Sequence, residues 1–467
     1  MGSTSKKRIG LELVCLAAIV AAAAFVYTRS LHTATNYDEG NYLASLDALR
    51  HGQTLGRDVF LDQPPGWYLL LQGLAVPFGA TVTGIRTGLM LVALLGLVAA
   101  WASARALAGP VAGLAAAAVL AVAPPYPTLA ASVESDPPST VLALCALALA
   151  LYAYRGRTKT WLAVAVGVVF ALALSVKLFA IVVALPIAVI VLRRRSVRDA
   201  ALPLAGFGVV VLAFVVGYRH VLHQMWQGVF GAHLNARGGH QPNGVSNLSR
   251  IVHLPDLHTP FGLLAWTGIV LALAWLVRRR PLRLWPLWLF TAGAALFTLE
   301  MKPLLDHHLV LLATALAVPV GAAIGATLER LQRFAPLLLV PAVAAGLYQE
   351  HRRLARNDVP ERPSYQWAAK IVAANSTPGQ LVVSDIPSVP FLAGRRQPGQ
   401  LIDTSIARIV DAYLKPRDVL RLIDASHAPL VVVGRNFRSQ PAIVRGIAQR
   451  YPRRLRNGDV TIYLRAR

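Results

Sequence analysis

The N-terminus indicates a membrane protein: Lys6-Lys7-Arg8 is followed by the apolar run IGLELVCLAAIVAAAAFV (residues 9–26). A run of this length can cross a bilayer as one helix, with its basic end in the cytoplasm. It could also be a secretory signal peptide. Because Tyr27-Thr28-Arg29 is a poor cleavage site and further apolar runs follow, we expect a first transmembrane helix.

The composition of the whole chain agrees with a membrane protein. Of its 467 residues 55% are hydrophobic and 15% charged, which is little charge for a soluble protein. The net charge of +24 comes from Lys and Arg clustered at the ends of apolar runs, a pattern of membrane topology and not of nucleic-acid binding. Cys15 and Cys145 lie inside apolar runs and indicate no disulfide or metal site. The sequence therefore predicts a polytopic α-helical membrane protein.

Short basic segments order the predicted spans. If the N-terminus and all five later basic segments are cytoplasmic, eleven helices result and the C-terminal region lies outside. The predicted spans are residues 9–28, 84–107, 111–131, 138–154, 160–176, 179–192, 200–217, 260–277, 284–299, 307–327 and 335–348. The apolar stretch from Pro64 to Gly79 is short, and we expect it to form a juxtamembrane helix that starts at Pro64-Pro65.

This topology collects the acidic residues on one face. The first outer loop, at about residues 30–83, carries Asp38, Glu39 and Asp62, and the second carries Asp136. Acids beside a bilayer are costly and usually have a task, so we expect an active site on the extracytoplasmic face.

The composition changes near residue 350. Residues 350–467 carry 20 Lys and Arg against 9 Asp and Glu, with short β-like runs at 381–383, 430–433 and 460–464 between helical patterns. We expect residues 1–349 to form the transmembrane catalytic domain and residues 350–467 a small soluble extracytoplasmic α/β domain. The sequence has no GxGxxG or Walker loop, which argues against an ATP-driven pump or a nucleotide-sugar enzyme.

The acidic pair in Asn36-Tyr37-Asp38-Glu39-Gly40 is the leading candidate for chemistry. A carboxylate at this position can act as general base on an acceptor hydroxyl. The alternative is structural: Asp38 caps the helix that starts near Gly40, and Glu39 lies in its favourable first turn.

Over about residues 9–330 the chain resembles the GT-C superfamily of membrane glycosyltransferases, in particular the branch of protein O-mannosyltransferases and lipid A aminoarabinose transferases. The resemblance rests on the order of its motifs. These are the acidic pair, Asp62-Gln63-Pro64-Pro65-Gly66-Trp67-Tyr68, Ser135-Asp136-Pro137, Lys177 at the outer end of a span, and His307-His308-Leu309-Val310-Leu311-Leu312. It implies a polyprenyl-phosphate sugar donor, Asp38 as catalytic base, and Glu39 orienting the base or the acceptor.

The chain departs from this branch at Gln63, where aminoarabinose transferases have a lysine thought to meet the donor phosphate. Another cation must replace it. Lys177 is the first candidate, unless it only snorkels to end a span. Further candidates for donor phosphate or sugar are Arg57, Arg86, Arg237, Lys302, His307 and His308.

Two further residues have alternative roles. Asp136 could orient Lys177 or bind a sugar hydroxyl, or it could cap the helix that begins at Pro137. The resemblance also allows one divalent metal, held by Asp62 and His233. Because the sequence has no metal-ligand box of the HxxH type, histidines hydrogen-bonded at the membrane surface are the alternative.

Together these features predict an inverting glycosyltransferase in a bacterial cytoplasmic membrane. It would move a sugar from a polyprenyl-phosphate donor to a hydroxyl of a cell-envelope glycan, lipid or protein, with no nucleic-acid partner. One rival is a transporter or flippase of a lipid-linked sugar, and another is a protein whose soluble domain binds wall polymer.

Overall fold

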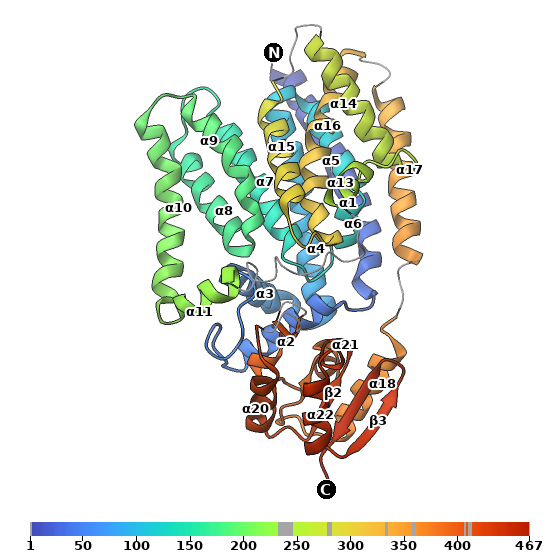
Figure 1. The fold of residues 1–467 in the computed structure, drawn as a ribbon. Coiled ribbons are helices and arrows are strands. Elements are labelled where there is room, and N and C mark those ends of the chain that lie inside the picture. The colour runs from blue at the N-terminus through green and yellow to red at the C-terminus, as the bar shows by residue number, and fades with distance from the viewer. Residues whose placement is uncertain are drawn as a thin grey trace. The chain divides into compact units, whose positions relative to one another are not determined.

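The computed structural model describes residues 2–231, 246–277, 283–331, 335–356, 360–405, 408–409 and 413–466. The chain forms two compact units, each assembled from three separate stretches (Figure 1). The first unit contains Met1–Leu31, Arg86–Val216 and Gln241–Asn357, and the second contains His32–Ile85, Gly217–His240 and Asp358–Arg467.

The first unit is helical. Its elements are α1 (Gly2–Tyr27), most of α4 (Val82–Ala108), α5 (Pro110–Ala121), α6 (Pro125–Leu129), α7 (Asp136–Ala153), α8 (Thr160–Val176), η2 (Leu178–Val183), α9 (Ala184–Leu192), α10 (Val197–Gly217), α13 (Asn247–His253), α14 (Pro260–Val277), α15 (Trp285–Glu300), η6 (Asp306–His308), α16 (Leu309–Leu331) and α17 (Ala335–Arg356). A short η1 (Thr28–His32) follows α1.

Small residues bring α5 and α16 together at the centre of this unit. A Cβ placed on Gly321 would lie 2.5 Å from the Cα of Ala116, and one on Gly325 would lie 2.5 Å from the Cα of Ala112. Glycines four residues apart let two helix backbones approach closely. Helices pack in this way inside a bilayer, where the hydrophobic effect does not drive their association. The result is a rigid central pair of helices.

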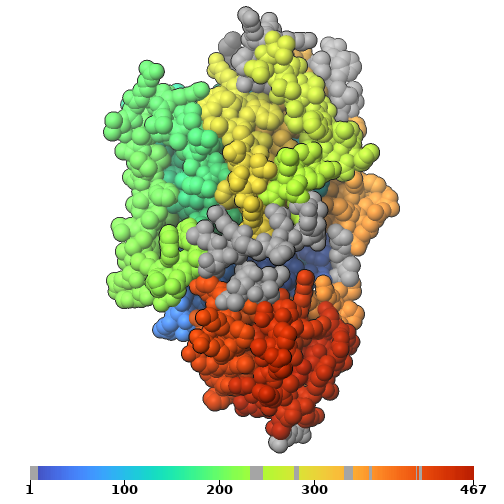
Figure 2. All heavy atoms as spheres, viewed as in Figure 1, coloured from blue at the N-terminus to red at the C-terminus, as the bar shows by residue number. Residues whose placement is uncertain are grey.

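Each of the eleven predicted spans overlaps a helix of the structure. Within the part of the chain that the structure describes, six helices are long and apolar enough to cross a membrane by length and composition, and shorter apolar helices include α5, α8 and the η2–α9 segment. The predicted span at 111–131 is interrupted, since α5 ends at Ala121 and α6 begins at Pro125. Gly206 is the one buried residue of α10, and the exposed side chains of this helix include the apolar residues Leu204, Val209 and Leu212. Figure 2 shows the atoms of this helix, in green, at the surface.

The second unit contains the sheet. Its elements are α2 (Tyr37–Arg50), α3 (Pro65–Phe78), η3 (Arg219–Val221), α11 (Leu222–Trp226), the π-helical turn η4 (Gln227–Gly231), α18 (Pro363–Ala374), β1 (Val383–Ser384), α19 (Ser388–Leu392), η7 (Gly399–Leu401), α20 (Pro416–Ser426), β2 (Leu430–Val433), α21 (Arg435–Arg438), α22 (Pro441–Arg450), β3 (Arg453–Asn457) and β4 (Val460–Leu464).

The four strands lie in the order β1-β2-β4-β3. The β1 and β2 strands are parallel, with Val383 opposite Val431, and β4 is antiparallel to both β2 and β3. The apolar strands β2 and β4 occupy the positions that the sequence predicts. The edge strand β3 was not predicted, because all five of its residues are exposed and three are arginines. Charge on an edge strand discourages pairing with other chains.

The first loop is part of this second unit. A Cβ on Gly40 of α2 would lie 2.7 Å from the backbone nitrogen of Ser388, and one on Gly399 would lie 2.3 Å from the carbonyl oxygen of Asp58. Helix α3 begins at Pro65 and ends before Gly79, whose φ of 83° is open to glycine, in agreement with the predicted juxtamembrane helix. The contacts therefore group residues 32–85 with the C-terminal residues.

Candidate functional site

Asn36 is the residue that caps α2. Its Oδ1 accepts a hydrogen bond from the Glu39 N–H at 2.8 Å, and Glu39 Oε2 accepts from the Asn36 N–H at 3.2 Å. This reciprocal pair of hydrogen bonds is a capping box, and Glu39 is buried. Glu39 therefore has a structural role at the start of α2. Asp38 is not the N-cap that the structural alternative supposed. It lies half-buried in the first turn, where the helix N-terminus favours a negative side chain.

Asp62 belongs to a polar group in the same unit. Its Oδ1 accepts from the Tyr68 hydroxyl, and its Oδ2 accepts from Asn41 Nδ2 at 3.2 Å. Removal from water raises the pKa of Asp62 to about 7, and the nearby Asp403 carboxylate adds to the shift, while the Tyr68 hydrogen bond opposes it. At neutral pH this carboxyl group therefore holds a proton part of the time.

Residues of the C-terminal stretch hold the start of α2. The Thr404 N–H donates to the Tyr37 hydroxyl at 2.7 Å, and the Tyr37 hydroxyl lies 3.4 Å from Asp403 Oδ1. Arg408 is 3% exposed; its guanidinium lies 3.8 Å from the Phe60 ring centroid and donates to the carbonyl oxygen of Asp403. These contacts could not be predicted from local sequence patterns, because Tyr37 and Thr404 are 367 positions apart.

A second group lies in the first unit, where Lys177 forms an ion pair with Asp136. Lys177 Nζ lies 2.6 Å from Asp136 Oδ2, and the two residues are 7% and 1% exposed. Ser139 Oγ donates to the Lys177 carbonyl oxygen at 3.0 Å, and Lys177 Nζ lies 4.5 Å from the Phe179 ring centroid. Asp136 thus holds the Lys177 ammonium, which is one of the roles that the sequence offered for it.

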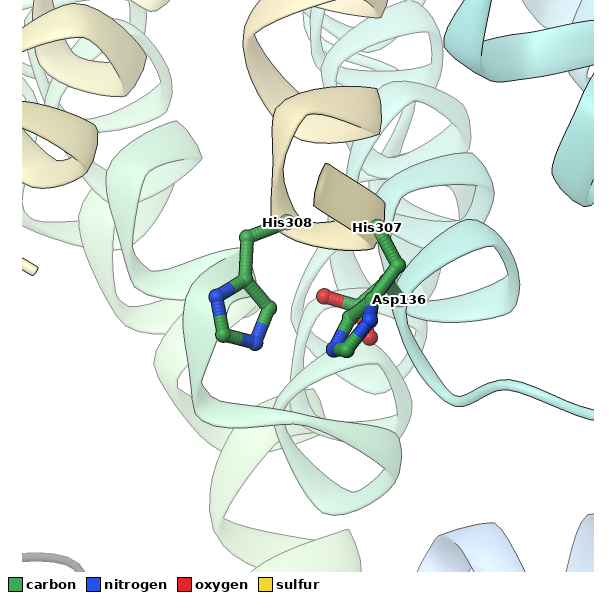
Figure 3. A group of neighbouring side chains, drawn as sticks. All are labelled: Asp136, His307 and His308. Carbon is green, nitrogen blue, oxygen red and sulfur yellow. The ribbon is translucent and has the colours of Figure 1, made fainter. Parts of the chain in front are cut away.

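His307 and His308 complete this group, and Figure 3 shows both rings with Asp136. One nitrogen of each ring and one oxygen of Asp136 lie within 4.8 Å of one another. The Asp136 Oδ1 is buried and has no hydrogen-bond partner among the described residues. The Leu305 N–H donates to His308 Nδ1 at 3.2 Å, so a neutral His308 carries its proton on Nε2.

The three ligand atoms are close enough for a metal ion, and the same group also carries hydrogen-bond donors. The Lys177 ammonium already occupies one oxygen of Asp136, and the His308 Nε2 is a donor when Nδ1 accepts. The ammonium and the imidazole N–H can donate to a phosphate oxygen, whereas the imidazoles and the Asp136 Oδ1, unpartnered among the described residues, are ligand types of a divalent metal.

The other candidate residues are placed as follows. Arg57 is exposed and pairs with Asp58 at 2.8 Å. Lys302 is exposed, in the segment before η6. Arg86 is buried in α4 and donates to the Leu31 carbonyl oxygen at 3.2 Å. His233, the predicted partner of Asp62 at a metal, and Arg237 lie outside the described residues.

Comparisons with known proteins agree with this architecture. A family model for dolichyl-phosphate-mannose-protein mannosyltransferase matches residues 62–218. The apo crystal structure of ArnT from Cupriavidus metallidurans is similar over 99% of this chain and 98% of its own, with TM-score 0.69 and 16% identity. The same protein bound to undecaprenyl phosphate gives TM-score 0.67 and 16% identity, over 97% of each chain.

A more distant structure belongs to an oligosaccharyltransferase of Archaeoglobus fulgidus in complex with Zn and sulfate. It covers 93% of this chain and 68% of its own, with TM-score 0.56 and 12% identity. A search of curated proteins found no match. The predicted fold class is confirmed: the chain is a multi-pass α-helical membrane protein that shares its fold with ArnT from Cupriavidus metallidurans and with the archaeal oligosaccharyltransferase.

Proposed function

We propose that this protein is a glycosyltransferase that takes a sugar from a polyprenyl-phosphate donor and transfers it to an acceptor hydroxyl, with inversion at the anomeric carbon. The observation that carries the proposal is the buried Lys177–Asp136 pair beside His307 and His308, in a chain with the fold of ArnT. A buried ion pair adds little stability over apolar packing, so its presence favours a functional role.

The lysine and histidine group acts on the donor. As the bond between the anomeric carbon and the phosphate oxygen breaks, negative charge develops on the departing polyprenyl phosphate. The Lys177 ammonium and the His308 Nε2–H are donors already held in place, by Asp136 and by the Leu305 N–H, so they need little reorganisation to stabilise that charge. Lys177 thereby supplies the positive charge that Gln63 lacks.

Asp38 acts on the acceptor. Its carboxylate takes the hydroxyl proton while the acceptor oxygen forms the new bond to the anomeric carbon. Glu39 supports Asp38 indirectly, because its capping bonds with Asn36 fix the first turn of α2. The donor already stores the energy of the sugar bond, so the reaction consumes no nucleotide. We place this chemistry on the extracytoplasmic face, where the charge pattern puts both groups of residues.

The test is sugar transfer by purified Asp38→Asn protein in detergent, with a panel of polyprenyl-phosphate sugars. Loss of a general base should lower the rate by about 10²–10⁴-fold. Asp47→Asn is the matched control, because Asp47 lies in the same helix and is also partly exposed. A folded Asp38→Asn protein that works at a near-normal rate would contradict the assignment.

The same assay separates the enzyme from a flippase. A flippase needs a sealed vesicle to show its activity, whereas an enzyme forms a glycosylated product in detergent. Lipid mass spectrometry of a deletion strain would then identify the donor, as the polyprenyl-phosphate sugar that accumulates.

A further inference from the structure

A polar cavity of about 420 Å³ lies in the first unit, among the ends of α7, α8, α9 and α10. It is separate in the chain from every residue assigned to the reaction above. Its lining includes Arg157, Thr158, Thr160, Arg194, Arg198 and Asp199. Three guanidinium groups against one carboxylate give the cavity a net positive charge.

Two of these guanidinium groups are available to a ligand. Arg157 has no hydrogen-bond or ion-pair partner among the residues that the structure describes, and Arg198 reaches only the Thr160 hydroxyl, at 3.5 Å. Arg194, by contrast, donates to two backbone carbonyl oxygens, and Asp199 Oδ2 accepts from the Thr158 hydroxyl at 2.8 Å. The Asp199 carboxylate therefore has a hydrogen-bond donor close by, whereas the Arg157 and Arg198 guanidinium groups have no anionic partner among the described residues. This arrangement favours an anionic ligand.

Two long helices begin at this cavity. Helix α8 starts at Thr160 and α10 at Val197, and no side chain caps α8 at Lys159. Their first turns add partial positive charge, and the first N–H groups of α8 have no side-chain cap, whereas in α10 the Asp199 N–H donates to Ser196 Oγ at 3.3 Å. The two helices are held firmly, since a Cβ on Gly167 of α8 would lie 1.8 Å from the carbonyl oxygen of Pro203 in α10.

The surroundings of the cavity are those of a membrane interface. Trp161, directly after Thr160, is 72% exposed, and exposed tryptophans at helix ends are typical of the headgroup region. The apolar side chains of α10, such as Leu204 at 68% exposure, face outward just beyond the polar lining. A ligand with a phosphate at the cavity and hydrocarbon along α10 would match both parts.

We propose that this cavity binds the phosphate headgroup of an anionic phospholipid, with Arg157 and Arg198 as its main contacts. Both arginines lie on segments that the charge pattern predicts to be cytoplasmic, where basic pockets between transmembrane helices bind such headgroups. The lipid would brace α8 and α10 where they begin. This inference does not depend on the proposed glycosyl transfer.

The test is native mass spectrometry of the full chain in mild detergent, titrated with cardiolipin, phosphatidylglycerol or phosphatidylcholine. We expect the anionic lipids to be retained in preference to phosphatidylcholine. Each arginine near a membrane surface contributes to the binding free energy of an anionic lipid. The double variant Arg157→Gln/Arg198→Gln should therefore bind the anionic lipids about thirtyfold more weakly. Arg283→Gln, an exposed arginine at the start of α15, is the matched control and should change nothing.

Two outcomes would overturn the proposal. One is equal retention of all three lipids, and the other is unchanged anionic lipid binding in the double variant. A competition arm with inorganic phosphate separates the sources: binding of phosphate alone, with no lipid preference, also refutes a headgroup site. If the double variant does not fold, Arg157→Gln alone decides, because that side chain has no partner among the described residues to lose.

Discussion

The Lys177–Asp136 pair provides the sharpest test of how this protein works. Lys177→Met removes the ammonium that lies 2.6 Å from Asp136 Oδ2. Because Oδ1 already lacks a partner among the described residues, the buried carboxylate would have no hydrogen bond left from them. Breaking a buried pair from one side typically costs about 3–5 kcal/mol, and Asp136→Leu should cost a similar amount by stranding the lysine.

The double variant Lys177→Met/Asp136→Leu removes both charges and should recover most of that stability. Activity should not recover, because the departing phosphate still lacks the ammonium. Loss of one such donor lowers the rate by about 10²–10³-fold. Thermal unfolding in detergent measures the first quantity, and sugar transfer from a polyprenyl-phosphate donor measures the second. Lys370→Met, at an exposed position of α18, should leave both unchanged.

The cycle has a clear refuting result. If the double variant regains both stability and sugar transfer, the pair only holds α7 and the end of α8 together, and the phosphate role is wrong. If stability returns and activity stays low, the pair acts on the donor.

Three further predictions concern the scaffold. Gly325→Val in α16 should destabilise the protein by several kcal/mol, because its Cβ would press on Ala112. Gly73→Ala in α3, where a Cβ would meet nothing within 4 Å, should raise the melting temperature slightly, and equal effects of the two variants on the melting temperature would contradict the packing argument. Arg408→Met should lower the free energy of unfolding by about 2–4 kcal/mol and lower the rate of sugar transfer, because the carbonyl oxygens of Gln400 and Asp403 would lose their hydrogen bonds. A variant with normal stability and normal transfer would show that Arg408 does not support this loop. Burial raises the pKa of Asp385 to about 6 from 3.8, so the folded state binds this proton more tightly than the unfolded state, and the free energy of unfolding should fall by about 3 kcal/mol as the pH rises from 4 to above 6. In Asp385→Asn the melting temperature should depend less on pH, and an unchanged pH dependence would refute this assignment.

The helical part of the fold could be predicted from the sequence because each apolar run carries its own signal. The strands β2 and β4 are also apolar runs, and both lie where the sequence predicts them. The edge strand β3 could not be found in this way. Its sequence RRLRN has no apolar alternation, and it becomes a strand only because β4 pairs with it residue by residue, from Arg453 opposite Leu464 onward.

The candidate site divides in the same way. The capping box of α2 was available in the sequence, since Asn36 and Glu39 have the spacing of a cap and its partner. The alternative with Asp38 as the cap is wrong, because Asn36 occupies that position in the structure. The contact of Tyr37 with Thr404 joins residues that no local pattern relates, so only the folded chain could show it. The metal prediction for Asp62 and His233 stays a prediction.

Asp62 and Asp136 are both removed from water, but the protein neutralises them in different ways. Asp136 forms an ion pair with Lys177. Among the described residues, the side chains that donate hydrogen bonds to Asp62 are neutral, Tyr68 and Asn41, and its pKa of about 7 means that a proton neutralises it part of the time at neutral pH. A cation that bound Asp62 would have to displace that proton, so its affinity would rise with pH through 7.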